Sequence, residues 1–129
     1  MVKTYVDTSA VLKLFLSEAE SEAVRAYLNT PSLERVSSWL LYTELHCAMQ
    51  RRQPGMPQIG LKPFLEGMTL VELTHEDLIS AHSRGPLRAL DALHLATAMR
   101  IGADEIITYD QELAEAAERM GIRAVSPGR

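Results

Sequence analysis

Short β-branched and aromatic runs alternate with amphipathic runs of helical periodicity along the whole chain. The pattern predicts strands at 3–6, 34–38, 69–73, 105–109 and 122–126. It predicts helices at 8–16, 18–30, 39–52, 61–67, 75–85, 88–102 and 111–121. Such alternation favours an α/β fold, a three-layer sandwich whose central, mainly parallel sheet is flanked by helices. In folds of this class, ligands gather beyond the carboxyl ends of the strands.

The length of 129 residues is typical of one domain, which we expect to cover residues 1–129. No apolar stretch approaches the roughly 18 residues that span a bilayer, and the first residues lack the apolar core of a secretory signal. We therefore expect a cytoplasmic protein with no membrane partner.

Cys47 is the only cysteine, which excludes an intramolecular disulfide and a thiolate zinc site. The segment 53–60, rich in helix breakers, is predicted to be a mobile loop.

Two aspartates follow directly on predicted strands. Asp7 closes the run TYVD and Asp110 closes IITYD, and a predicted helix begins after each of them. Because the carboxyl ends of parallel strands meet at one edge of a sheet, both carboxylates should lie at that edge. The competing interpretation is an N-cap, since aspartate accepts backbone N–H bonds in the first turn of a helix.

Two further acids interrupt apolar helix faces. Glu44 lies on the apolar stripe of WLLYTELHCAM, where its carboxylate is partly desolvated. A buried charge is costly unless it is paired or bound to metal, so the alternative for Glu44 is an ion pair with an arginine. Asp91 interrupts RALDALHLATAM, and its alternative is a pairing with Arg88 or His94 on the helix surface.

Taken together, the four acids indicate a cation site. If they converge, mutual repulsion raises their pKa values or demands a cation. Oxygen ligands without a Cys or His set suit Mg²⁺ or Mn²⁺. The net charge of −4 has the wrong sign for a protein that coats nucleic acid, so a polyanionic substrate would need this cation or a local basic patch.

Four segments carry a resemblance to a known family. VDTSAVLKLF, TEL, RALDALHLATA and ITYDQELAEAA, in this order, resemble the PIN-domain ribonucleases, most closely the VapC-type toxins of bacterial toxin-antitoxin pairs. The match covers the first 16 residues, the third predicted helix and most of 88–122. It says little about 18–35 or 53–85.

The resemblance implies a metal-dependent endoribonuclease with a PIN-like fold. Carried over by position, Asp7, Glu44, Asp91 and Asp110 match the acids that hold Mg²⁺ or Mn²⁺ in that family. Ser9 and Thr108 match hydroxyl positions that support the site. No acid of the pattern is missing, so we expect an active enzyme that hydrolyses RNA phosphodiester bonds.

The resemblance also implies partners. They are an RNA substrate, a cognate antitoxin protein that occludes the active site, and a second copy of the chain in a homodimer. The candidates for contact with the RNA backbone are Arg51, Arg52, Arg84 and Arg88. The alternative for the pair Arg51 and Arg52 is a solvated position that complements the helix dipole. No histidine shows metal-ligand spacing, and all four are assigned to surface or core.

Other magnesium-binding and phosphate-binding classes fit less well. A receiver-like signalling domain needs adjacent acids after the first strand, and a dehalogenase-type phosphatase needs a second aspartate at position 9, which is serine. Neither GxxxxGK nor GxGxxG occurs. The remaining alternative is a catalytically inactive PIN-like module kept for partner binding.

Overall fold

The sheet has five strands, and every neighbouring pair is parallel. In the computed structural model, which describes residues 1–55 and 60–129, the strand order is β3-β2-β1-β4-β5. The strands are β1 (Val2–Val6), β2 (Leu33–Ser38), β3 (Thr69–Val71), β4 (Glu105–Ile107) and β5 (Arg123–Val125). The predicted α/β class is confirmed, and the described sheet is parallel throughout.

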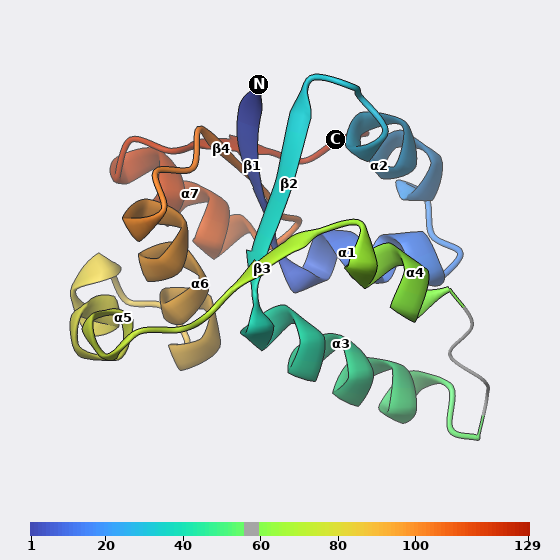
Figure 1. Ribbon diagram of the computed structural model, residues 1–129, viewed down its shortest axis with the longest axis horizontal. Helices are drawn as coiled ribbons and strands as arrows, with labels where there is room; N and C mark the ends of the chain where they lie inside the picture. Colours follow the sequence, from blue (N-terminus) through green and yellow to red (C-terminus); the bar gives the residue numbers. More distant parts are fainter. Residues whose placement is uncertain (56–59) are drawn as a thin grey trace.

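Helices cover both faces of the sheet (Figure 1). They are α1 (Thr8–Phe15), α2 (Ser21–Leu28), α3 (Trp39–Arg52), α4 (Leu61–Glu66), α5 (His75–Ser80), α6 (Ala89–Arg100) and α7 (Gln111–Arg119), with a 3₁₀ turn over Ala81–Arg84. Figure 1 shows α5, α6 and α7 on one side of the strands and α1, α2 and α4 on the other. This arrangement is the predicted three-layer sandwich.

Neighbouring strand residues bury their side chains in opposite layers of the core. Val6 and Ile107 pack with apolar residues of α1 to α4, whereas Tyr5 and Ile106 pack with residues of α6 and α7. All four side chains are fully buried. The alternation follows from the pleat of a strand, and burial on both faces explains why the central strands read as continuous apolar runs.

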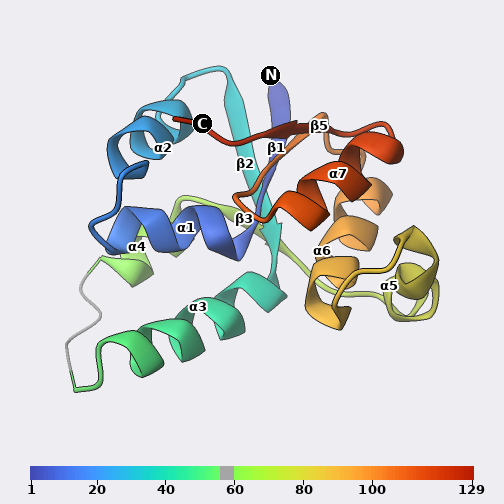
Figure 2. The same cartoon turned by 180° about the vertical axis from the view of Figure 1, so that it is seen from behind.

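The carboxyl ends of β1 and β4 lie side by side. Val6 pairs with Ile107 in the register, and the backbone N–H of Asp7 donates to the carbonyl oxygen of Ile107 at 3.0 Å. Figure 2 shows α1 and α3 running alongside each other at this end of the sheet. Residues that follow β1 and β4 therefore meet residues of α3 at one edge.

Some helices and strands end at other residues than predicted. The helix predicted at 75–85 is a short α-helix followed by the 3₁₀ turn, which ends at Gly85 with φ of 121°. The strand predicted at 105–109 ends at Ile107, which leaves Thr108 and Asp110 in the loop at the sheet edge. The centre of the loop predicted at 53–60 lies outside the described residues. None of the described helices has the length and apolarity to cross a membrane.

Candidate active site

The four predicted acids line one cavity of about 400 Å³ at the carboxyl edge of the sheet. Asp7 follows β1, Glu44 comes from the middle of α3, Asp91 from the first turn of α6, and Asp110 follows β4. Four separate parts of the chain thus supply one carboxylate each. The convergence depends on the parallel topology, because only that topology places these strand ends on a common edge.

Asp7 is held by two hydroxyl groups. Its Oδ2 accepts hydrogen bonds from Ser9 Oγ at 2.7 Å and from Thr108 Oγ1 at 2.8 Å, and the residue is only 3% exposed. Asp7 occupies the N-cap position of α1, but its side chain makes no capping bond. The N-cap interpretation is therefore wrong for Asp7, whose carboxylate is oriented by the two predicted supporting residues.

The same two hydroxyls organise the loop after β4. Ser9 Oγ accepts from the backbone N–H of Tyr109 at 2.9 Å, and Thr108 Oγ1 accepts from the N–H of Asp110 at 3.0 Å. Each hydroxyl donates to Asp7 and accepts from a backbone N–H of the loop after β4. Ser9 and Thr108 therefore fix the distance between the two strand ends that carry Asp7 and Asp110.

Asp110 is also a helix cap. Its Oδ1 accepts from the backbone N–H of Leu113 at 3.0 Å, in the first turn of α7. The N-cap interpretation thus describes Asp110 correctly, and the residue lines the acid cavity as well. Capping and a role in the cavity are compatible, because the cap uses one oxygen of the carboxylate.

Glu44 is bound through a single oxygen. Its Oε1 accepts from Thr8 Oγ1 at 2.9 Å and lies 2.5 Å from His94 Nε2. Burial acts to raise the pKa of Glu44, but the hydrogen bond and the charge of His94 outweigh it and lower that pKa. The alternative of an arginine partner is wrong, since a histidine occupies that place.

His94 and Thr8 are site residues that the sequence did not reveal, and both contact Glu44. The His94 side chain is fully buried in α6, in agreement with the assignment of the histidines to surface or core. Its contact with Glu44 was not predicted. Burial acts to lower the pKa of His94, and the bond to Glu44 with the charge of Asp7 raises it above its ordinary value. The sequence feature that could have indicated this role of His94 is its position three residues after Asp91, within an apolar stretch of the same helix.

Asp91 carries the clearest sign of electrostatic conflict. Burial, followed by repulsion from Asp7 and Asp110, raises its pKa to about 6. Neither of the surface pairings that would explain Asp91 structurally, with Arg88 or His94, is formed within the described parts of the chain. Its carboxylate borders the cavity, half-buried and close to other acids.

Other buried acids of this protein are neutralised by arginine, and the four cavity acids are not. Asp77 pairs with Arg100 at 2.9 Å, and Glu105 pairs with Arg123. Across residues 1–55 and 60–129, no lysine or arginine forms an ion pair with any of the four cavity acids. Within these residues His94 is the one cationic partner of the cavity acids, so four carboxylates share at most one positive charge.

The donor set fits a hard divalent cation. Only one oxygen each of Asp7 and Glu44 accepts hydrogen bonds within the described structure, which leaves the other oxygen available. Among the described residues, no group of three or more His, Cys, Asp or Glu side chains has the geometry to hold a metal ion. Since Mg²⁺ often binds through one or two carboxylates and keeps several waters, a complete protein cage is not required.

Comparison with known proteins identifies the family. Residues 4–119 match the family described as PIN domain. The chain belongs to the PIN-domain family. It is 37% identical to Ribonuclease VapC46 of Mycobacterium tuberculosis (strain H37Rv), over 98% of this chain and 99% of that protein. Ribonuclease VapC47 of Mycobacterium tuberculosis (strain CDC 1551) is 35% identical, over 96% of each chain.

Solved structures agree with this PIN-domain fold. VapC20 of Mycobacterium tuberculosis, described as a sarcin-ricin loop cleaving toxin, has a TM-score of 0.71 at 16% identity, covering 96% of this chain and 99% of its own. A toxin-antitoxin complex from Klebsiella pneumoniae has a TM-score of 0.69 at 18% identity, covering 96% and 97%.

The predicted resemblance to VapC-type endoribonucleases is confirmed by the curated relatives. PIN-domain ribonucleases of this type generally depend on a divalent metal. The receiver-like domain and the inactive binding module are not favoured.

Two of the four predicted RNA-contact arginines border the acids of this PIN domain. Arg51 lines the acid cavity itself, and Arg88 lines an adjoining hollow of about 490 Å³ together with Asp110. Arg52 points elsewhere and approaches Glu18 at 3.9 Å. The Nε atom of Arg84 is buried without a hydrogen-bond partner in the described structure. Arg51 and Arg88 are thus the two predicted arginines that lie beside the cavity acids.

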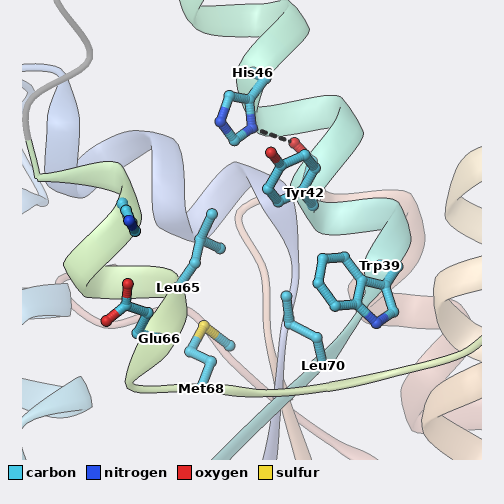
Figure 3. Close-up of a pocket in the computed structure, with 8 residues that line it drawn as sticks. Trp39, Tyr42, His46, Leu65, Glu66, Met68 and Leu70 are labelled. Atoms are coloured by element: carbon cyan, nitrogen blue, oxygen red, sulfur yellow. Dashed lines mark hydrogen bonds between the residues drawn. The ribbon is translucent and has the colours of Figure 1, made fainter.

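The PIN domain has a second, apolar hollow between α3, α4 and β3 (Figure 3). It measures about 540 Å³ and is lined by Trp39, Tyr42, His46, Lys62, Leu65, Glu66, Met68 and Leu70. Trp39 and Tyr42 are 45% and 43% exposed. Figure 3 shows Tyr42 and His46 of α3 facing Leu65 of α4. Although this hollow is larger than the acid cavity, it lacks a carboxylate cluster and does not resemble a hydrolytic site.

Proposed function

We propose that this PIN-domain protein is an endoribonuclease whose Asp7, Glu44, Asp91 and Asp110 hold Mg²⁺ or Mn²⁺. The observation that supports this most strongly is the meeting of four carboxylates in one cavity, with no lysine or arginine paired to them in the described structure. A purely structural role would not leave four carboxylates with His94 as their one cationic partner in the described structure.

The ion, when bound, would supply a water of lowered pKa and neutralise charge on the phosphate oxygens. The protein supplies the fixed geometry. Asp7 and Glu44 are each anchored by one oxygen, so their remaining oxygens keep a constant direction. One of the four acids would act as the general base.

The substrate is proposed to be RNA, held along its backbone by Arg51 and Arg88. Phosphate contacts position a nucleic acid without reading its sequence, and arginine is suited to them. Arg51 lines the acid cavity, and Arg88 lines the hollow that adjoins it at Asp110. Both would contact phosphates close to the bond that is cleaved.

Two protein partners are proposed. One is a cognate antitoxin, since the comparison structures include a toxin-antitoxin complex from Klebsiella pneumoniae. The other is a second copy of the chain, joined through the apolar hollow that exposes Trp39 and Tyr42. Such an enzyme would act in the cytoplasm, where it would be expressed together with its antitoxin.

Cleavage of RNA by the purified chain tests the proposal. We expect cleavage with Mg²⁺ or Mn²⁺ and none after chelation with EDTA. Asp7→Asn should abolish cleavage, whereas the matched control Glu22→Gln, which alters an exposed acid on α2, should not. Retained cleavage by Asp7→Asn, or cleavage that EDTA leaves unchanged, would contradict the proposed function.

A further inference from the structure

We propose that His94 is a positioning residue that acts through Glu44. It holds Oε1 of this carboxylate and thereby directs Oε2 into the acid cavity, toward the divalent ion. This inference rests on the proposed function, because it assigns a role within the same site.

The contact joins two helices that are distant in the sequence. His94 Nε2 lies 2.5 Å from Glu44 Oε1, across 50 residues, and 3.8 Å from Asp7 Oδ1. A single imidazole nitrogen thus faces two of the four acids. His94 therefore couples the position of α6, which also carries Asp91, to the orientation of Glu44 on α3.

The other imidazole nitrogen of His94, Nδ1, is also hydrogen bonded. The hydroxyl of Tyr5 lies 2.7 Å from Nδ1 of His94 and is also hydrogen bonded to Ser38 Oγ at 3.1 Å. The rings of Tyr5 and His94 are in edge contact, with centroids 5.6 Å apart. A chain of hydrogen bonds thus runs from Ser38 through Tyr5 and His94 to Glu44.

Burial excludes direct contact between His94 and substrate. The residue is 0% exposed, as is Tyr5. His94 can affect the reaction only through the carboxylates beside it, and of these it is hydrogen bonded to Glu44. Groups that hydrogen bond to metal ligands typically change metal affinity or activity by about 10–100-fold when they are removed.

Glu44 Oε1 has a second donor, Thr8, which is distinct from the histidine. The Thr8 hydroxyl binds the same oxygen at 2.9 Å from the first turn of α1. Since both donors converge on Oε1, neither competes with the ion for Oε2. Loss of His94 should therefore loosen Glu44 without freeing it completely, which predicts weakened rather than abolished metal binding.

The test compares His94→Met with His94→Gln. Methionine fills the buried space but removes the donor, whereas the glutamine amide can place an N–H near the position of Nε2. We expect His94→Met to bind Mn²⁺ about 10–100-fold more weakly by calorimetry, with lower kcat and an unchanged KM for RNA. His94→Gln should recover most of the affinity. In a Glu44→Gln background, His94→Met should cause no further loss.

A purely structural role would give a different result. His94→Met would then melt at a lower temperature and bind Mn²⁺ as wild type does, which would overturn the inference. If His94→Met fails to fold, Tyr5→Phe serves as the test, because it removes the hydroxyl that holds Nδ1 of His94. Weaker Mn²⁺ binding by Tyr5→Phe would support the inference, and unchanged binding would refute it. Failure of the proposed function is distinct, because wild type itself would then show no Mn²⁺ binding and no metal-dependent cleavage.

Discussion

The hydroxyl of Thr108 donates to Oδ2 of Asp7 over 2.8 Å and joins two strand ends that are 101 residues apart in the sequence. The oxygen of the Thr108 hydroxyl also accepts from the backbone N–H of Asp110. Thr108 is fully buried, so its hydroxyl has no access to solvent. One side chain therefore sets the separation of two cavity acids.

Thr108→Val should destabilise the protein. Valine keeps the shape but leaves the Asp110 N–H without its acceptor and Asp7 with only the Ser9 donor, which costs about 1–3 kcal/mol per buried group. Thr108→Ser, the matched control, retains the hydroxyl and should lose less. Urea denaturation of both variants measures the difference. Equal stabilities for the two variants would show that these hydrogen bonds contribute little.

Asp91→Asn should stabilise the metal-free protein above pH 6. The pKa of Asp91 in the folded state, about 6, exceeds the ordinary value for aspartate of about 3.9. Between these values the folded state holds a proton that the unfolded state has lost, so stability falls as pH rises. Because Asp91 is half-buried, solvent screening limits the gain from the substitution to about 1 kcal/mol at pH 8.

Urea denaturation in EDTA between pH 3 and 8 measures this effect. The advantage of Asp91→Asn should vanish below pH 4, where aspartate is largely protonated in both states. Addition of Mn²⁺ should reverse the order at pH 8, because the ion stabilises a site that retains all four carboxylates. A pH-independent difference would show that repulsion at Asp91 does not cause it.

Arg51→Ala should weaken RNA binding. Arg51 borders the acid cavity, whereas its neighbour Arg52 points toward Glu18. Loss of one phosphate contact should raise KM several-fold and reduce the salt dependence of binding. Arg52→Ala provides the matched control, with the same change of charge at the next position. Equal effects of the two substitutions would indicate a general electrostatic contribution and no specific contact.

Tyr42→Ser should weaken self-association. Tyr42 is 43% exposed beside Trp39 in the apolar hollow, and a buried aromatic anchor often dominates an interface. Sedimentation velocity should show a dimer for wild type and more monomer for Tyr42→Ser, with circular dichroism confirming the fold of both. A monomeric wild-type chain would refute the proposed homodimer.

The sequence predicted the order of the elements and the place of the acids, for physical reasons that are particular to this fold. Asp7 and Asp110 follow strands, and parallel strands leave little freedom over which edge they share. Glu44 and Asp91 were noticed because carboxylates on apolar helix faces are costly. The structure brings all four to one cavity.

Contacts that depend on helix packing could not be predicted. His94 meets Glu44 only because α6 packs near α3, and local periodicity carries no information on that approach. The N-cap interpretation of Asp7 was wrong because Ser9 and Thr108 compete for the carboxylate, and Thr108 is distant in sequence. The helix predicted at 75–85 was too long as an α-helix, because its last turn tightens to 3₁₀ geometry before Gly85.

Crystallography with Mn²⁺ tests the central claim most directly. Anomalous scattering from crystals soaked in Mn²⁺ should give a peak in the cavity bounded by Asp7, Glu44, Asp91 and Asp110, within coordination distance of their oxygens. Crystals of Asp91→Asn should show this peak weakened. An empty cavity at saturating Mn²⁺, or a peak confined to another part of the molecule, would contradict the account.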